Sequence, residues 1–318
     1  MTLPNRHLAG QIAHLTRRTT QRQFLLKNDK KNLAKNEMGY LLGLTVLRHN
    51  QTPHALVIMS NHTHLCITDN NGRRADFMRD FHHLTTKVVN KRLQRRESLW
   101  SSSAPGNTVL LDTQKVIDTM LYIWLNPVTA GLVSKVAHWQ HFCILPRHWG
   151  KKMRFKRPDY FRKRENSEHL PEFIEFTPMP PAMFDHLPLK EVIAMFERWM
   201  KDAEKRIRAE RKEKFGKKNI VGMKACLSQS HFATPKSSVK MYARNPRFSS
   251  TCAKKIAAAI VAMRTFWRVY KKRLEGFREG STARFPSGTV SMVLRFNRAC
   301  LNLGNADPHL PNYQPYLI

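Results

Sequence analysis

The sequence has few acidic residues, few cysteines and no long apolar run. The longest uninterrupted apolar stretch is Ile256 to Met263, whereas a membrane-spanning helix needs about 20 residues, so we expect no transmembrane helix. The five cysteines are scattered and form no Cys-x-x-Cys pair, which argues against a thiolate zinc site or a disulfide framework. The N-terminus lacks the apolar stretch of a signal peptide, and a Walker-type phosphate loop is absent. We therefore expect a cytoplasmic protein.

Charge of one sign dominates the chain. There are 55 Lys and Arg against 23 Asp and Glu, and the formal net charge is +32. Such an excess cannot be neutralised within the chain and calls for a polyanionic partner. Nucleic acid is the expected partner and implies association with the nucleoid. An anionic membrane surface is the weaker alternative, because neither terminus shows a basic amphipathic helix.

The chain of 318 residues suggests two domains, or one domain with a long extension. The composition changes near Pro146, where a basic stretch that contains several prolines begins. We place a boundary there, between a first domain of residues 1–145 and a basic, mainly helical region of residues 146–318. The second region is expected to bind DNA or to serve as an accessory element.

Short strands and helices alternate in the first domain. Strands are predicted at 12–19, 54–59, 62–68 and 108–111, and helices at 32–48, 76–95 and 112–126. We expect Gly39 to interrupt the first of these helices, Asp112 to cap the third and Pro127 to stop it. The interleaving predicts an α+β fold with an antiparallel sheet and helices on one of its faces. In the second region, long helices are predicted at 188–218 and 253–277.

Two histidines lie two residues apart in the predicted strand 62–68. His62 and His64 therefore point to the same face of the sheet, and Thr63 points to the other. Neutral imidazoles side by side on a rigid strand are a natural half-site for a divalent metal. The signal is weak on its own, because the chain has 15 histidines.

A tyrosine and an asparagine share one face of the predicted helix 112–126. Tyr122 and Asn126 are four residues apart, hence neighbours on that face. They would approach the two histidines if the helix packs against the histidine-bearing face of the sheet. The alternative is that Tyr122 is an ordinary half-buried aromatic residue and Asn126 merely ends the helix before Pro127.

Taken together, the two segments resemble the REP-associated tyrosine transposases, which are single-tyrosine HUH transposases of the insertion-sequence type. The matching residues are Asn61-His62-Thr63-His64-Leu65 and Tyr122-Ile123-x-x-Asn126-Pro127-Val128-x-Ala130-Gly131-Leu132-Val133. His14 to Arg18 and the helix from Asp80 to Arg92 also match. The resemblance covers about residues 7–140. Thr63 departs from the bulky hydrophobic residue usual between the histidines.

The resemblance implies a ferredoxin-like catalytic domain in residues 1–145 and a DNA strand transferase and endonuclease activity. His62 and His64 would bind Mg²⁺ or Mn²⁺, with Asn126 as the third ligand. Tyr122 would be the nucleophile that forms a covalent 5′-phosphotyrosine. The substrate would be single-stranded or hairpin DNA from repeat elements, bound by a monomer or a homodimer.

Two basic segments are candidate DNA contacts. Both groups of cations could bind phosphate, and Trp149 and Phe155 in the second segment could stack on unpaired bases. The candidates are Arg17, Arg18 and Arg22 after the first strand, and Lys151, Lys152, Arg154 and Arg157 in a stretch that continues to Arg164. The alternatives are a solvated strand end for the first group and a flexible basic linker for the second.

Two other functions stay open at this point. One is a non-catalytic nucleic-acid-binding protein, domesticated or degenerate, on the same fold. The other is an HUH nuclease of plasmid replication or conjugation. The single candidate tyrosine in its Tyr-x-x-x-Asn-Pro context favours a transposase over the latter.

Overall fold

The computed structural model describes residues 3–159, 170–216, 220–235, 246–281 and 284–289, together with residue 292 and the backbone of residues 300–301. Its helices are α1 (Leu33–Arg48), α2 (Arg74–Arg92), α3 (Thr113–Thr129), α4 (Leu189–Phe215), α5 (Met223–Ser228) and α6 (Ala253–Arg278). Its strands are β1 (Gln11–Arg18), β2 (Gln51–Ile58), β3 (His62–Asp69), β4 (Gly106–Leu110), β5 (Cys143–Ile144), β6 (Met153–Lys156), β7 (Phe173–Phe176), β8 (Phe248–Ser249), β9 (Phe285–Pro286) and β10 (Cys300–Leu301).

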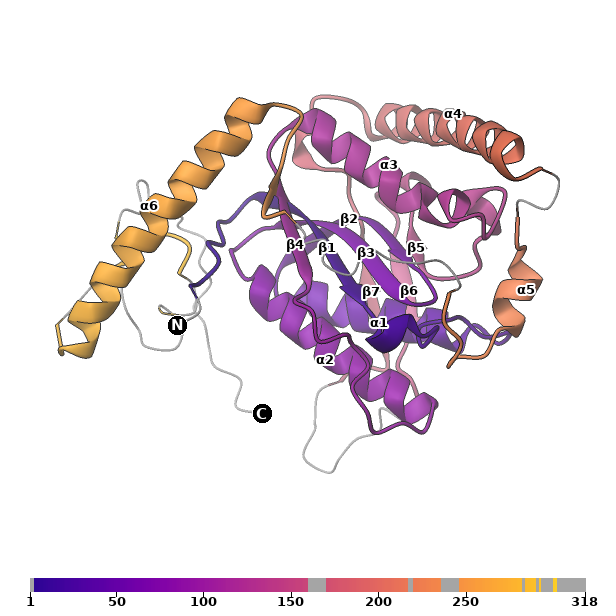
Figure 1. Ribbon diagram of the computed structural model, residues 1–318, viewed down its shortest axis with the longest axis horizontal. Helices are drawn as coiled ribbons and strands as arrows, with labels where there is room; N and C mark the ends of the chain where they lie inside the picture. Colours follow the sequence, from indigo (N-terminus) through magenta and orange to yellow (C-terminus); the bar gives the residue numbers. More distant parts are fainter. Residues whose placement is uncertain are drawn as a thin grey trace.

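A six-stranded sheet with the order β5-β2-β3-β1-β4-β8 forms the centre of the molecule (Figure 1). Its strands pair antiparallel, except that β8 runs parallel to β4. Two-stranded pairs, β6 with β7 and β9 with β10, lie outside it. The predicted α+β class, with a largely helical C-terminal part, is confirmed.

Helices cover both faces of the sheet, which corrects the prediction of one covered face. Side chains of β2 alternate between two cores: Leu56 and Ile58 join the side chains of α1 and α2, whereas Ala55 and Val57 join those of α3 and α4. The two helix layers lie on opposite sides of the sheet in Figure 1. The physical reason is the unbroken apolar run in β2, which is typical of a strand that is buried on both faces.

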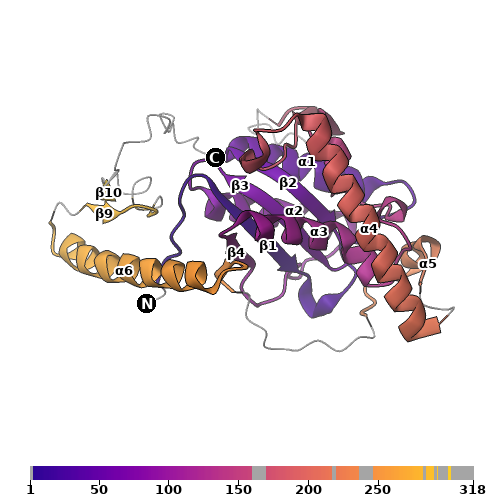
Figure 2. The ribbon, with the colours of Figure 1, turned by 90° about the horizontal axis from the view of Figure 1, so that it is seen from above.

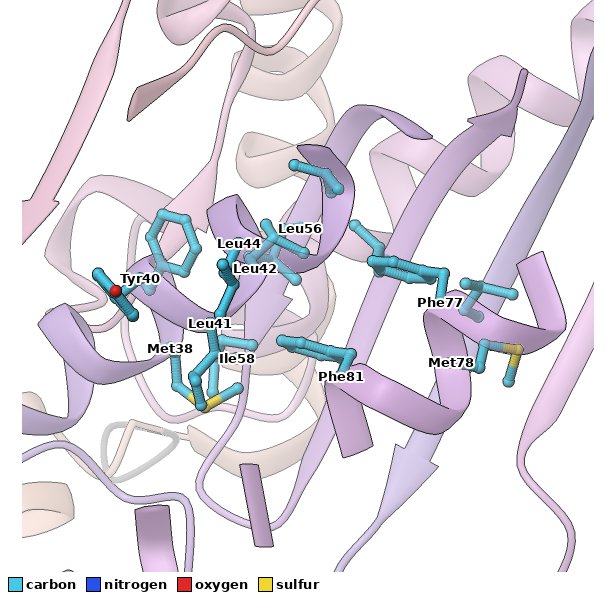
Figure 3. Close-up of a cluster of buried hydrophobic side chains, with 14 of the residues drawn as sticks. Met38, Tyr40, Leu41, Leu42, Leu44, Leu56, Ile58, Phe77, Met78 and Phe81 are labelled. Atoms are coloured by element: carbon cyan, nitrogen blue, oxygen red, sulfur yellow. The ribbon is translucent and has the colours of Figure 1, made fainter. Parts of the chain in front are cut away.

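The first core lies between the sheet, α1 and α2 (Figure 3). Leu56 and Ile58 of β2 meet Leu41 of α1, and the rings of Phe77 and Phe81 stack with centroids 5.8 Å apart. This apolar layer fixes α1 and α2 on the face of the sheet opposite to α3.

Helix α1 runs through Gly39 without interruption, which corrects the prediction of a break there. A Cβ atom at Gly39 would lie 2.2 Å from the nearest ring carbon of Phe155, and one at Gly43 would lie 2.8 Å from Phe176. Because Gly39 and Gly43 have no side chains, the β6–β7 hairpin can pack closely on α1.

The second core lies between the sheet, α3 and α4. Trp124, Trp149 and Phe196 pack around each other, with ring centroids 5.1–5.9 Å apart, and all three are fully buried. Residues after the predicted boundary at 145/146 thus contribute to this core, and Ile174 and Phe176 contribute to the other.

The ends of α3 are set by Asp112 and Gly131. Asp112 caps the helix as predicted, since its carboxylate accepts from the Lys115 amide at 2.8 Å. Pro127 does not stop the helix, which corrects the prediction: it lies in the last turn, and the helix continues to Thr129. The helix ends in a Schellman arrangement: Gly131 has a φ of 69°, and the Leu132 and Gly131 amides donate to the carbonyls of Pro127 and Val128.

Cys66, Cys143, Cys226 and Cys252 are free thiols. Among the described residues, no helix is long and apolar enough to cross a membrane.

Gly39→Ala tests the packing of the hairpin. Alanine favours a helix over glycine by about 1 kcal/mol, but the new Cβ would overlap the Phe155 ring, which is held by Phe142 and Phe176. We expect the overlap to dominate and to lower the free energy of unfolding by about 1–3 kcal/mol in urea denaturation. The loss should shrink in the Gly39→Ala/Phe155→Leu double variant. A more stable Gly39→Ala protein would contradict this packing.

Candidate active site

The candidate site lies between the sheet and α3. Strand β1 pairs with β3 so that Arg18 faces His62 and Thr16 faces His64. Alternate side chains of both strands, His14 included, therefore point to the face on which α3 packs. Helix α3 reaches this face through its contacts with β2 and β3.

The structure brings the four predicted site residues together. The rings of His62 and His64 have centroids 4.8 Å apart and are nearly perpendicular. The Tyr122 ring lies 5.4 Å from that of His64, and the Nδ2 atom of Asn126 lies 3.3 Å from His64 Nε2. His64 is buried and His62 is half-buried, whereas Tyr122 is 51% exposed, so a solvent-accessible phenol stands beside the two imidazoles.

Hydrogen bonds fix the proton on each of the two rings. His62 Nδ1 lies 2.7 Å from Asn61 Oδ1, which only accepts, so Nδ1 carries the proton and Nε2 is bare. Asn126 donates to His64 Nε2, so the His64 proton is on Nδ1 and is donated to His14 Nε2 at 3.0 Å. Asn126 also contacts the His62 ring. The arrangement leaves lone pairs of both imidazoles beside one carboxamide.

His14 is a site residue to which sequence analysis assigned no role. Its ring stacks on that of His64 with centroids 5.2 Å apart and an interplanar angle of 19°. Its position in the first matching segment was a signal, but the contact depends on the pairing of β1 with β3. Local periodicity does not give that pairing.

Burial keeps the three histidines neutral at pH 7. It lowers the pKa of His62 to about 4, with a further contribution from the Arg18 charge, and the pKa of His14 to about 4, with a contribution from Lys115. The pKa of His64 lies well below its usual value because of burial and its two histidine neighbours. Neutral imidazoles offer lone pairs without first releasing a proton.

The predicted cations of the first segment divide between two places. Arg18 is exposed and lies across the strand pair from His62, on the same face of the sheet. The charge of Arg22 also lowers the pKa of His62. Arg17 points to the other face, where its guanidinium donates to the carbonyls of Ser101 and Ser103 at 3.1 and 2.7 Å. Arg18 and Arg22 thus belong to the site surroundings, and Arg17 holds a loop.

The second basic segment lies on the opposite side of the sheet, on the β6–β7 hairpin over α1. Arg154 pairs with Glu175 and stacks over the Phe173 ring. Trp149 and Phe155 pack in the two cores, so the prediction that they stack on bases is wrong. Residues 160–164 lie outside the described residues. The DNA-binding role stays a prediction for Lys151, Lys152, Arg154 and Arg157.

The donor set for a metal is two imidazoles and one carboxamide. Among the described residues, no group of three or more His, Cys, Asp or Glu side chains is placed to hold a metal ion. The Nε2 atom of His14 already accepts the hydrogen bond from His64 Nδ1. Asn126 lies against both rings, so its amide oxygen could serve as a third protein ligand beside His62 and His64.

No protein-family model and no curated protein matches the chain. Among solved structures, it is similar to a REP-associated tyrosine transposase bound to a REP hairpin, with 18% identity and a TM-score of 0.38 over 46% of this chain and 84% of that one. It is also similar to a protein from Deinococcus radiodurans R1 classed as a transposase, with 16% identity and a TM-score of 0.27 over 36% and 89%. The function proposed below rests on the site geometry.

The ring protons can be located by nitrogen NMR. In the metal-free protein at pH 7, we expect His62 and His64 to carry their protons on Nδ1, in ring ¹⁵N–¹H correlation spectra that distinguish protonated from bare nitrogens. Asn61→Ala removes the acceptor and should release His62 from this tautomer, while exposed His83 stays unchanged as the reference. A His62 proton found on Nε2 in the unmodified protein would contradict the hydrogen-bond assignment.

Proposed function

We propose that the protein is a metal-dependent, single-tyrosine HUH-type transposase, which nicks and rejoins single-stranded or hairpin DNA. The observation that carries the proposal is the half-exposed phenol of Tyr122 beside the neutral imidazoles of His62 and His64 and the carboxamide of Asn126. The spatial conjunction is more specific than either motif by itself.

Tyr122 acts as the nucleophile. Its phenolic oxygen forms a bond to the phosphorus of a phosphodiester, while the bond from that phosphorus to the 3′-oxygen breaks. The phenolic proton leaves to water at the exposed side of the ring, and the departing oxygen takes a proton to become a 3′-hydroxyl. The 5′-phosphotyrosine retains a phosphodiester bond, so a 3′-hydroxyl can later attack it and rejoin the strand without ATP.

The donor set fits a divalent cation. His62 and His64 present neutral nitrogens, and Asn126 can present its amide oxygen after rotation of the carboxamide. Imidazoles with an amide oxygen suit Mn²⁺ better than Mg²⁺, which prefers oxygen ligands. Such an ion, when bound, supplies a Lewis acid for the scissile phosphate. Asn61 and His14 orient the two rings through their Nδ1 atoms.

Arg18 and Arg22 supply positive charge at the rim of the site. Arg18 is exposed beside His62, where it can hold a phosphate of the incoming strand. Contacts of this kind position the backbone and carry no sequence information directly.

The alternative of a degenerate, non-catalytic binding protein finds little support in the site. Its sequence argument is the departure at Thr63. That side chain is buried at 3% exposure and lies on the face of β3 that meets the first core, away from the donors. The departure therefore affects packing and leaves the arrangement of His62, His64, Tyr122 and Asn126 intact.

Tyr122→Phe should abolish covalent attachment to DNA. With Mn²⁺ and a set of hairpin oligonucleotides that carry unpaired flanks, we expect the unmodified protein to form an adduct that survives denaturation. Tyr122→Phe should lose it at least about 1000-fold, because no oxygen remains to attack, while DNA affinity stays within about threefold. Tyr270→Phe, a tyrosine on α6, is the matched control. An adduct that persists in Tyr122→Phe would refute the assignment of the nucleophile.

Substitutions around the imidazoles should weaken Mn²⁺ binding in a graded way. His64→Ala removes a donor and should abolish measurable Mn²⁺ binding and the adduct, in electron paramagnetic resonance titrations of free Mn²⁺. His14→Leu removes only the partner of His64 and should lower affinity about 10–100-fold, whereas His14→Gln keeps an acceptor and should lose less. Exposed His83→Ala is the control. Undiminished Mn²⁺ binding by His64→Ala would rule this metal site out.

A further inference from the structure

Helix α6 has an unusually one-sided charge. It contains eight Lys and Arg residues and a single carboxylate, that of Glu275. The comparably long helix α4 mixes nine cations with six carboxylates. The positive charge of α6 is therefore far less compensated along its own length.

Four of these cations lie along one side of the helix. Their spacing of four, three and one residues keeps them on one stripe, and the side chains are Arg264, Arg268, Lys271 and Lys272. All four are exposed. They line an open hollow of about 650 Å³ together with Leu3, Trp267 and the single carboxylate of the helix, that of Glu275. In the described part of the chain, no salt bridge engages any of the four cations. With Arg278 the stripe extends about 21 Å along the axis.

The aromatic residues of α6 are already engaged. Phe266 is buried, and Tyr270 packs against Phe285 with ring centroids 5.6 Å apart. Trp267 donates its Nε1 hydrogen to the Pro4 carbonyl at 2.9 Å, and the guanidinium of Arg247 lies over its ring. Among the described residues of α6, the exposed large apolar side chains are Ile260 and Val261 and not aromatic rings. Trp267 lines the same hollow as the cations, but the Arg247 guanidinium already lies over its ring, so the stripe offers charge without a free ring for base stacking.

Helix α6, which carries the stripe, is connected through β8 and Asp112 to the start of α3, the helix that carries Tyr122. Strand β8, just before α6, pairs with β4, and the Thr251 amide donates to Asp112 Oδ2 at 2.9 Å. The same carboxylate caps α3, on which Tyr122 lies about 14 Å from the first helical residue. From this joint α6 projects away from the sheet (Figures 1 and 2).

We infer that the stripe on α6 binds the phosphate backbone of duplex DNA, next to the strand that is cut at Tyr122. Binding of single strands without sequence preference combines cations with stacked aromatic rings, whereas a duplex hides its bases and presents phosphates. A rigid cationic stripe without free aromatic rings matches the duplex. The choice of DNA rests on the proposed function; the preference for a duplex rests on α6 itself. Recognition is independent of sequence, since phosphates carry no base identity.

The test compares two fourfold charge removals in the full chain. Each replaces exposed cations of one helix by glutamine, which has a similar helix propensity. The stripe variant is R264Q/R268Q/K271Q/K272Q, and the matched control on α4 is K201Q/K205Q/K212Q/K214Q. Fluorescence anisotropy measures binding to a blunt duplex of random sequence and to an unpaired oligonucleotide of equal length, over a series of salt concentrations. Circular dichroism melting verifies that both variants fold.

We expect the stripe variant to bind the duplex at least about tenfold more weakly at 100 mM salt. Its negative slope of log K against log salt should become less steep by about 3.6. The control should stay within about threefold. Equal losses in both variants would overturn the inference, as would a larger loss for the unpaired oligonucleotide than for the duplex. Duplex RNA bound more tightly than duplex DNA would overturn the assignment to DNA. Adduct formation is scored separately, so its absence with an intact stripe effect would refute only the proposed chemistry.

Discussion

The packing of α3 against the sheet is the constraint on which the rest of the structure depends. Trp124 is fully buried and donates to the Ile144 carbonyl at 2.6 Å, which ties the middle of α3 to the edge strand β5. Ile123 beside it joins the same core as Val57 and Cys66. A helix fixed at these points has only one rotation available. That rotation turns Tyr122 and Asn126, two residues before and two residues after Trp124, toward the histidines of β3.

Burying His64 beside the half-buried His14 and His62 is costly unless its polar atoms are satisfied, and its own neighbours meet this condition. An unpaired buried nitrogen would cost about 1–3 kcal/mol. Asn61 accepts from His62, and Asn126 and His14 occupy both nitrogens of His64. The same low-dielectric surroundings that make these bonds necessary also keep the rings uncharged. The stability of these rings and the neutral state that the proposed metal site requires therefore have a common physical origin.

The sequence predicted what depends on short spacing and missed what depends on pairing. The i, i+2 relation of His62 and His64 and the i, i+4 relation of Tyr122 and Asn126 placed each pair on one face, and the structure adds that the two faces meet. The contact of His14 with His64 could not be predicted, because it follows from the β1–β3 register. Trp149 and Phe155 were misread because an aromatic residue among cations has the same pattern whether it is buried or exposed. Their burial comes from α3, α4 and the glycines of α1, which are distant in the sequence.

The distribution of charge separates the proposed DNA-binding surface on α6 from the proposed metal site. The charges of Arg18 and Arg22 lower the pKa of His62, whereas no cation of α6 contributes to the shift at His62 or His64. Cations crowded around the imidazoles would repel a divalent ion and oppose its binding. Cations on α6, which contribute nothing to these pKa shifts, can attract a polyanion without opposing an ion at the proposed site. In a chain with a net charge of +32, the proposed cation site therefore requires that most of the cations lie elsewhere.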